Sequence, residues 1–397
     1  MNLAERADRI SHSPTLRIAA LAKKMRAGGA DVLDFSVGQP DFPTPVSAKE
    51  AGKTAIDDNR TGYTANEGIP ELREAIADKL RLENDLDYPP ADIIVSPGAK
   101  ATLYFLAMAL FQAGDEVLIP SPYWVSYPEQ VGLAEATPIF IQSEEKNSFG
   151  LTAAELEAAV TPRTKALILN YPNNPTGSCY ERVELEALAR VCVEHNLLVI
   201  SDEIYERLIY DGRTFTSIAS LGTEIKSRTV VVNGMSKAFS MTGWRLGYAA
   251  GPSAIIDAMG KIQSHSTSNA TSISQWAGLE ALRWAGDDVN RMVAAFQERR
   301  DVMLARLLAF PGVTCPRPAG AFYAFPNVSA YFGRSHPGGV IGSALDLSTY
   351  LLDTAHVAVV PGEAFGAPGN VRLSYATSKE KIEEGTSRIA VALEALG

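Results

Sequence analysis

Short apolar runs rich in β-branched residues recur along the chain and alternate with amphipathic stretches. The runs occupy residues 92–96, 115–120, 136–141, 165–170, 197–201, 229–233 and 245–251. Between them, apolar residues recur at three- and four-residue spacing, which predicts helices over 71–84, 99–114 and 181–196. Strands that alternate with helices favour a mostly parallel sheet of seven strands, covered by helices on both faces.

The pattern changes beyond about residue 300. Short strand-like runs such as "VAVVPGEAFG" and "NVRLSYAT" are separated by proline and glycine turns and end in a helical stretch, which indicates a smaller α+β domain. The first 40 or so residues have no sheet partner nearby in sequence, so we expect them to dock on that domain. The predicted division is therefore an N-terminal segment over 1–45, a large domain over 46–298 and a small C-terminal domain over 299–397.

Charge and composition exclude several kinds of partner. The 397 residues carry a net charge of −10 without a basic block, which disfavours a nucleic-acid partner. The sequence shows neither a secretory h-region nor a membrane-length apolar run, so we expect no membrane contact and a cytoplasmic location. Three cysteines without a CxxC pair and five histidines without an HExxH motif suggest no disulfide frame and no metal site.

The stretch "NGMSKAFSMTGWRLGY" places Lys237 in a connection between two apolar runs. An ammonium group removed from water is costly unless it is paired or neutralised. Lys237 is therefore either a residue whose stem lies along the protein while its ammonium reaches solvent, or an amine used in chemistry.

Three further residues follow predicted strands directly. Gly98 opens a helix after "DIIVS", a junction that aims free backbone N–H groups at an anion, although a plain strand–helix turn is the alternative. Asn174 lies in the stiff turn "YPNNPTG", whose role could be structural alone. Asp202 follows "LLVIS", where its carboxylate either needs a partner or caps a helix. Because the carboxyl ends of parallel strands share one edge, we expect these residues and Lys237 to converge in one crevice.

An amine, a carboxylate, an amide and a phosphate cradle are the parts that hold pyridoxal 5′-phosphate. At this point the chain resembles the class I aminotransferases of fold type I, through "SVGQPDFPTP", "GYTANEGIPELREAI", "SPYWVSYPE", "NYPNNPTG", "SDEIYE", "SKAFSMTGWRLGY" and "NVRLSYATS". The resemblance implies that Lys237 forms the covalent link to the cofactor and that Asp202 partners its pyridine nitrogen. Tyr205 and Asn174 would hydrogen-bond the ring oxygen.

The same resemblance implies roles for further residues. Ser236, Arg245, Gly98, Ala99 and Lys100 would surround the phosphate, and Trp124 would stack on the cofactor ring. Tyr63 would reach the phosphate of a neighbouring subunit, which implies a homodimer. Arg372 and the backbone of Gly38 would hold the substrate α-carboxylate, with Asn174 and Trp124 beside it. Pro97, Ala101 and Tyr171 depart from residues common in close relatives, so the shape of the pocket could differ.

The substrate side chain needs a cation of its own if it is acidic. The stretch 264–276 contains no arginine, although some aspartate aminotransferases place one there. In the branch that resembles bacterial aspartate/prephenate aminotransferases, the match to Lys100 meets this carboxylate, and Ser13, Thr15 and Ser266 would add hydroxyls. The alternative is that Lys100 only neutralises phosphate or faces solvent.

The resemblance implies a transaminase that moves an amino group between aspartate or glutamate and 2-oxo acids, prephenate among them, by a ping-pong mechanism. Three alternatives remain: a preference for aromatic or other neutral amino acids, elimination chemistry on the same cofactor, and a non-enzymatic effector-binding module of the same fold.

Overall fold

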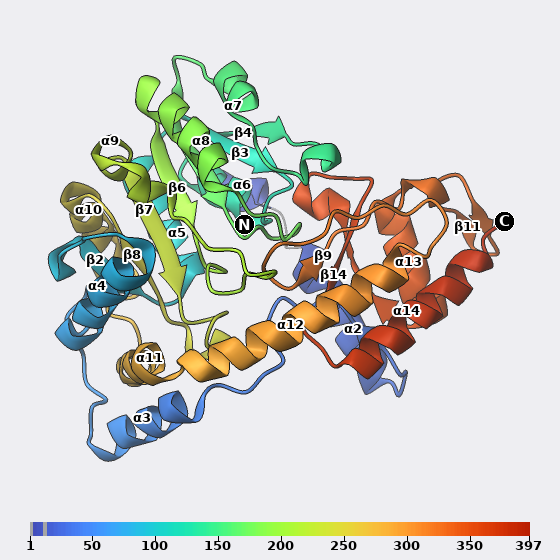
Figure 1. Ribbon diagram of the computed structural model, residues 1–397, viewed down its shortest axis with the longest axis horizontal. Coiled ribbons are helices and arrows are strands. Elements are labelled where there is room, and N and C mark those ends of the chain that lie inside the picture. The colour runs from blue at the N-terminus through green and yellow to red at the C-terminus, as the bar shows by residue number, and fades with distance from the viewer. Residues whose placement is uncertain (1–2, 11–13) are drawn as a thin grey trace.

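The computed structural model describes residues 3–10 and 14–397 and contains the predicted central sheet (Figure 1). The seven strands lie in the order β2-β8-β7-β6-β5-β3-β4, and only β8 runs antiparallel to its neighbours. Their bounds are β2 Ile93–Ser96, β3 Glu116–Ser121, β4 Thr137–Gln142, β5 Thr164–Asn170, β6 Leu198–Asp202, β7 Thr229–Gly234 and β8 Gly247–Ala250. The predicted mostly parallel sheet is confirmed.

Two layers of helices bury this sheet. One face packs against α5 Ala99–Leu110, α6 Ser126–Leu133 and α10 Ser253–Ser264. The other packs against α4 Pro70–Asn84, α7 Ala153–Ala159, α8 Arg182–Glu194, α9 Thr223–Lys226 and α11 Ser272–Trp284. Strands buried on both faces need apolar residues at every position, which is why runs such as "ALIL" in β5 show no alternation.

The small domain is built around short strands and long helices. A three-stranded sheet has the order β13-β14-β9, with bounds Val360–Pro361, Val371–Ser374 and Tyr323–Ala324. Beside it lie α12 Gly286–Leu307, α13 Ala344–Ala355, α14 Lys379–Glu394 and a hairpin of β10 Ser335–His336 and β11 Gly339–Val340. Figure 1 shows α12 running from α11 of the large domain to α14 of the small one.

The N-terminal segment docks on the small domain, as the sequence predicts. Strand β1 Leu33–Asp34 pairs in parallel with β12 Val357–Ala358, more than 300 residues later in the chain. Helix α1 covers Glu5–Arg9, α2 covers Pro14–Ala27 and α3 covers Val46–Asp57. Short 3-10 turns complete the described elements: η1 Pro90–Asp92, η2 Glu145–Asn147, η3 Ile218–Leu221, η4 Thr242–Trp244, η5 Ser329–Tyr331 and η6 Gly362–Phe365.

Two local predictions were wrong, and one alternative is excluded. The helix expected over 99–114 ends at Leu110, because Phe111 is extended and Gly114 turns the chain at a positive φ of 95°. The strand expected over 245–251 begins only at Gly247, because Arg245 is left-handed at φ 52°. Asp202 caps no helix, because turns rather than a helix follow it.

The register of the central strands sets the position of the functional side chains. Asn170, the last residue of β5, lies beside Asp202, the last residue of β6, and Asp202 lies beside Val232 of β7. The connections that follow these strands therefore open on one edge of the sheet, next to the small domain.

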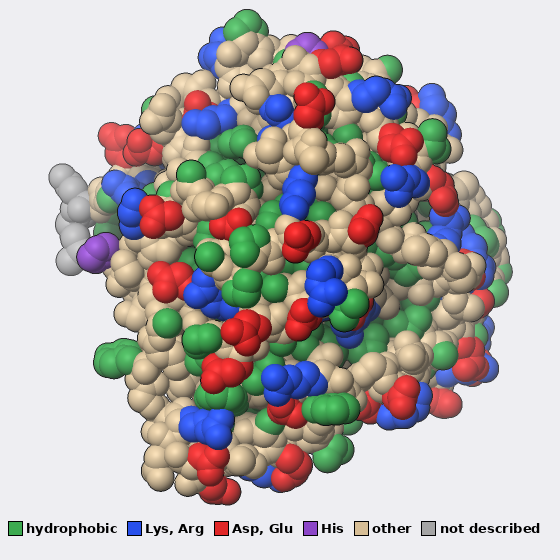
Figure 2. Space-filling view, turned by 60° about the vertical axis from the view of Figure 1, so that its left-hand side comes forward, with side chains coloured by type: hydrophobic (Ala, Val, Ile, Leu, Met, Phe, Trp, Pro, Cys, Tyr) green, Lys and Arg blue, Asp and Glu red, His purple; other side chains and the backbone are tan. Residues whose placement is uncertain are grey.

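The surface fits the composition. Lysine and arginine side chains alternate with aspartate and glutamate over the face in Figure 2, without a large area of one charge. Among the described residues, no helix is both long and apolar enough to cross a membrane.

Candidate active site

A cavity of about 380 Å³ lies at the carboxyl edge of the central sheet, where the small domain meets it. Its walls come from the N-terminal segment, the connections after the central strands, and strands β9 and β14. The lining residues are Ser36, Val37, Gly38, Gln39, Ala99, Lys100, Leu103, Trp124, Tyr127, Asn170, Asn174, Asp202, Ile204, Tyr205, Ser236, Lys237, Thr242, Arg245, Tyr323 and Arg372. The predicted convergence on one crevice is confirmed for Lys237, Asp202 and Asn174.

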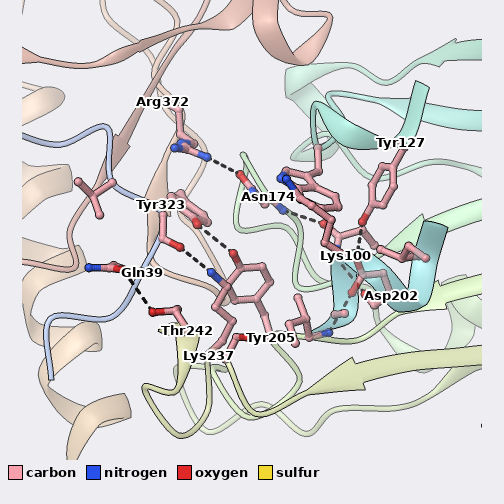
Figure 3. A pocket seen from close by; sticks show the side chains of 18 of the residues that line it. Gln39, Lys100, Tyr127, Asn174, Asp202, Tyr205, Lys237, Thr242, Tyr323 and Arg372 are labelled. Atoms are coloured by element: carbon pink, nitrogen blue, oxygen red, sulfur yellow. Dashed lines mark hydrogen bonds between the residues drawn. The ribbon is translucent and has the colours of Figure 1, made fainter. Parts of the chain in front are cut away.

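Lys237 extends into this cavity (Figure 3). Its Nζ donates to the carbonyl oxygen of Gly38 at 2.5 Å. Burial, together with the nearby Arg372 and Arg245 charges, lowers the pKa of Lys237 to about 7, against the opposing effect of Asp202. The alternative that this lysine reaches solvent is wrong, and its amine has a proton affinity suited to acid–base chemistry near neutral pH.

Asp202 lies at the floor of the cavity with 3% of its surface exposed. Its Oδ2 accepts the hydroxyl of Tyr127 at 2.6 Å, and its Oδ1 accepts the backbone N–H of Ile204 at 3.2 Å. Burial raises the pKa of Asp202 to about 6, although these hydrogen bonds and Lys237 oppose the shift. At neutral pH the residue is a carboxylate whose two oxygens are aimed by the surrounding structure.

Arg372 and Asn174 meet across the cavity from different domains. The Arg372 Nη1 donates to Asn174 Oδ1 at 2.9 Å, and Nη2 donates to the carbonyl oxygen of Ser36 at 2.7 Å. The Nε of Arg372 is buried and has no partner among the described residues. Because buried polar groups normally find partners, this guanidinium is prepared to receive an anion.

Aromatic side chains form the remaining walls. The hydroxyls of Tyr205 and Tyr323 lie 2.9 Å apart, and both phenols are buried. The Lys100 Nζ lies 4.9 Å from the centroid of the Trp124 ring, and both residues line the cavity; Lys100 is labelled in Figure 3. Burial lowers the pKa of Lys100, and the positive charge of Arg245 lowers it further. A flat ligand therefore meets an aromatic wall with a cation beside it.

The start of helix α5 forms an anion cradle. Gly98 has φ 91°, and a Cβ atom there would lie 2.6 Å from Nη2 of Arg245. A Cβ atom at Gly247 would lie 2.3 Å from the backbone nitrogen of Ala99. Both glycines thus allow the Arg245 guanidinium and the first N–H groups of α5 to approach one another. Ser236 lines the same cavity and adds a hydroxyl.

Several predicted residues lie elsewhere. Gly98 does not line the cavity itself, although it opens the helix that does. Tyr63 is 95% exposed, and Ser266 is bonded to the carbonyl of Ile262 at the end of α10, so neither reaches the cavity of its own chain. Ser13 lies outside the described residues, as does the side chain of Thr15. A contribution of Tyr63 and Ser266 from a partner chain, and of Ser13 and Thr15 from the N-terminal segment, stays a prediction.

The sequence analysis missed six polar residues of the cavity, of which Gln39 and Thr242 bond to each other and four hold predicted residues. Tyr127 holds Asp202, Tyr323 holds Tyr205, Ser36 accepts from Arg372, and Asn170 accepts the backbone N–H of Asn174 at 2.9 Å. Tyr127 lies one helical turn after Trp124 in "SPYWVSYPE", and Asn170 ends a strand, so position alone could have indicated these two. Nothing local marks Tyr323 or Ser36.

Metal and thiol chemistry find no support in the residues that the structure describes. They contain no group of three or more histidine, cysteine, aspartate or glutamate side chains suited to a metal ion. Burial raises the pKa of the Cys179, Cys192 and Cys315 thiols to about 12, so these thiols stay protonated at neutral pH.

Residues 30–389 match the sequence family described as aminotransferase class I and II. The chain belongs to this family. It is 47% identical over 395 residues to an aspartate aminotransferase of Geobacillus stearothermophilus, covering 100% of both chains. It is 46% identical over 389 residues to an aspartate/prephenate aminotransferase of Cereibacter sphaeroides, covering 98% of this chain and 97% of the relative.

Solved structures agree with this assignment. The aspartate aminotransferase from Rhizobium meliloti superposes with a TM-score of 0.96 at 43% identity, covering 100% of each chain. The aspartate aminotransferase from Thermus thermophilus with maleate superposes with a TM-score of 0.93 at 42% identity, covering 99% of this chain and 100% of that one. The predicted fold type and family are therefore confirmed.

The family depends on pyridoxal 5′-phosphate, and the cavity fits this group. Only glycine fits at positions 98 and 247, because a Cβ atom there would collide with Arg245 or Ala99. This close approach of the backbone matches a phosphate held by the N–H groups at the start of α5. The carboxylate of Asp202 can face a pyridine nitrogen, and the Lys237 amine can meet an aldehyde.

Proposed function

We propose that the protein is a pyridoxal 5′-phosphate-dependent aminotransferase that moves an amino group between aspartate or glutamate and 2-oxo acids. The observation that carries the proposal is the single cavity in which the Lys237 amine, the Asp202 carboxylate and the Arg372 guanidinium all lie. Asp202 is ionised at neutral pH, Lys237 is partly neutral, and the Nε of Arg372 has no partner among the described residues. Transamination needs these states, and each residue comes from a different element of the fold.

When bound, the cofactor would supply an electron sink that weakens the Cα–H bond of an amino acid. The Asp202 carboxylate holds a proton at the pyridine nitrogen, because an ionised acid beside a ring nitrogen favours its protonated form. The Tyr127 hydroxyl keeps that carboxylate oriented at 2.6 Å. Asn174 and Tyr205, which both line the cavity, would orient the ring through its oxygen.

Lys237 carries the proton in this mechanism. With a pKa of about 7, a substantial fraction of the amine is neutral near neutral pH and can accept a proton from the substrate Cα. Its Nζ is aimed by the Gly38 carbonyl, so the base stays inside the cavity. The same ammonium can then return the proton to another atom on the same side of the ligand.

Two cations select an acidic substrate. Arg372 binds the α-carboxylate with its guanidinium, whose Nε has no partner among the described residues. Lys100, beside Trp124, binds the carboxylate of the side chain. Because a lysine is a point charge on a flexible stem, the site should accept dicarboxylates of different lengths, prephenate among the acceptors. The relatives named for aspartate and prephenate, and the relative solved with maleate, support this choice.

The assembly belongs to the same proposal. Tyr63 is 95% exposed in the single chain, as a residue that serves a neighbour's phosphate would be. We therefore infer a homodimer in which each active site needs both subunits. A monomer that stays fully active on dilution, followed by light scattering, would contradict this arrangement. The domain boundaries near residues 45 and 298 and the cytoplasmic location stay predictions.

The function is tested with a panel of amino donors against 2-oxoglutarate, oxaloacetate and prephenate. We expect aspartate and glutamate to be the best donors, with ping-pong kinetics. The Lys237→Ala variant should lose transamination while it still folds and binds the cofactor, because the phosphate cradle does not involve this lysine. Faster turnover of aromatic or branched donors would favour the relative named an aromatic aminotransferase of Pyrococcus horikoshii, at 40% identity, as the better guide to substrate. Absence of transamination with every donor would leave the effector-binding alternative.

A further inference from the structure

Glu203 is a fully buried carboxyl group directly behind the cavity. It follows Asp202 in the chain, and because successive side chains of an extended segment point to opposite faces, it lies on the far side of the sheet edge. Its exposed fraction is 0%. A buried acid that touches no ligand is costly, so its presence here calls for a function.

One carboxyl oxygen of Glu203 makes both of its side-chain hydrogen bonds with the described residues. The hydroxyl of Ser201 donates to Oε1 at 2.8 Å, and the hydroxyl of Ser217 donates to the same atom at 2.6 Å. The second oxygen, Oε2, has no partner among the described residues. Glu203 therefore joins the end of β6 to the segment that enters η3.

The segment around Ser217 is itself held firmly. The backbone N–H of Ile218 donates to the Tyr171 hydroxyl at 2.8 Å, and the ring of Phe215 stacks on that of Tyr171 with centroids 5.3 Å apart. Tyr171 follows Asn170, whose side chain donates to the carbonyl oxygen of Asp202 at 3.0 Å. The contacts of Glu203, Tyr171 and Asn170 thus surround the backbone that carries Asp202.

The backbone of this turn determines where the Asp202 carboxylate points. The N–H of Glu203 donates to the Val232 carbonyl at 2.9 Å, and the N–H of Ile204 donates to Oδ1 of Asp202. A small rotation at residue 203 would move both the Ile204 N–H and the Asp202 side chain. Displacements of about 1 Å in an active site reduce rates by as much as ~10²-fold.

We propose that Glu203 is a positioning residue that fixes the Asp202 carboxylate from the opposite face of the sheet, as an acceptor for the hydroxyls of Ser201 and Ser217. The inference rests on the proposed role of Asp202. A positioning role for Glu203 explains why a glutamate occupies a buried position at which an apolar residue would cost less free energy.

The electrostatic surroundings agree with a role through hydrogen bonds rather than charge. Burial, together with the negative Glu206, raises the pKa of Glu203 to about 8, while Ser217, Ser201 and Lys79 oppose the shift. Lys79 is engaged in its own buried ion pair with Glu206. Glu203 is therefore mostly uncharged at neutral pH, and a glutamine of the same shape can replace it.

The test compares Glu203→Gln with Glu203→Met in the cofactor-loaded enzyme. The methionine has similar length but accepts no hydroxyl, so we expect kcat to fall about 10-fold while KM changes less than about 2-fold. The pH midpoint of the visible absorbance should also shift, because Asp202 no longer faces the pyridine nitrogen correctly. Glu203→Gln should restore both values towards wild type. Ser217→Ala, a milder change, should move both values in the same direction as Glu203→Met.

Glu206→Gln is the matched control. Glu206 is also buried and also lies in this turn, but it bonds to Lys79 and Asn84 of α4. This variant should lower the thermal stability without moving the absorbance midpoint. The proposal is overturned if Glu203→Met behaves like the control, or if Glu203→Gln is as impaired as Glu203→Met.

Two further measurements, the turnover of Asp202→Ala and the cofactor affinity of the variants, separate this proposal from the proposed function. Asp202→Ala tests the role of Asp202 itself, so unchanged turnover in that variant would show that another group serves the pyridine nitrogen, whereas absence of transamination in the unmodified enzyme would remove the proposed function. If Asp202→Ala is impaired and Glu203→Met is not, only the positioning role fails. The affinity of the cofactor-free variants for pyridoxal 5′-phosphate, followed by fluorescence quenching, should be weakened by Glu203→Met and not by Glu203→Gln.

Discussion

Arg372 of β14 and Asn174 of the connection after β5 are joined by a hydrogen bond of 2.9 Å, although 198 residues separate them in the chain. Asn174 lies beside the seven-stranded sheet, whereas Arg372 belongs to the three-stranded sheet. The bond therefore ties a group that is expected to orient the cofactor to a group that is expected to bind the substrate carboxylate. Any change in the relative position of the two domains would alter both contacts at once.

The geometry of Arg372 predicts that lysine cannot replace it. Arg372→Lys should raise KM for aspartate about 10- to 100-fold, because a charged hydrogen-bonding group is worth about 1.5–3 kcal/mol and a lysine lacks the planar fork. Steady-state kinetics check this. Arg334→Lys is the control, because Arg334 lies in the small domain outside the cavity and packs on Tyr331. Equal effects of the two substitutions would contradict the assignment of Arg372.

The contact between Tyr127 and Asp202 predicts a graded loss of turnover. Asp202→Ala should lower kcat by roughly 10²-fold or more, since the pyridine nitrogen loses the charge that keeps it protonated. Tyr127→Phe should cost about 10-fold, because one charged hydrogen bond is removed and the carboxylate remains. Tyr104→Phe, on α5, serves as a control for the loss of a hydroxyl. A Tyr127→Phe enzyme with wild-type kcat would show that Asp202 needs no such support.

The position of Lys100 in the cavity predicts that its replacement changes the specificity for amino donors rather than the overall rate. Lys100→Ala should reduce kcat/KM for aspartate and glutamate by about 1–3 kcal/mol, because their side-chain carboxylates lose a cation. Alanine and phenylalanine should be affected little, so they act as internal controls in the same preparation. A uniform loss for all four donors would indicate that Lys100 serves the phosphate instead.

Lys237 predicts a pH-dependent stability in the cofactor-free protein. Its pKa is lowered in the folded state to about 7 from 10.5, so between these values the unfolded chain binds more protons than the folded one. Stability should therefore fall as the pH decreases from about 10.5 to 7. Lys237→Met should remove this dependence, as measured by urea unfolding at several pH values. A wild-type slope in the Lys237→Met variant would place the responsible group elsewhere.

Glu203 and Asp202 contribute with the opposite sign. Their pKa values are raised, to about 8 and about 6, so their contribution is fully present below their unfolded values of 4.5 and 3.8 and is lost as the pH rises through the folded ones. The contribution of Asp202 changes between pH 3.8 and about 6, and that of Lys237 between about 7 and 10.5. One unfolding experiment at several pH values therefore distinguishes the two residues.

The sequence by itself determined the sheet and the identity of its edge residues. Apolar β-branched runs can be stable only as buried strands, and the residue that follows each run must lie at the carboxyl edge. Lys237, Asp202 and Asn174 were therefore placed correctly from local pattern, and the motifs around them matched a known family.

Only the tertiary structure decided which side chains face one another. Tyr323 approaches Tyr205 from 118 residues away, Ser36 accepts from Arg372 across 336 residues, and Glu203 finds Ser217 on a separate segment. The hydrophobic periodicity of the sequence indicates whether a position is buried, but not which residue packs beside it. The pKa values of Lys237 and Asp202 depend on the same contacts, because the loss of water around a charge is a property of the packed cavity and not of the chain.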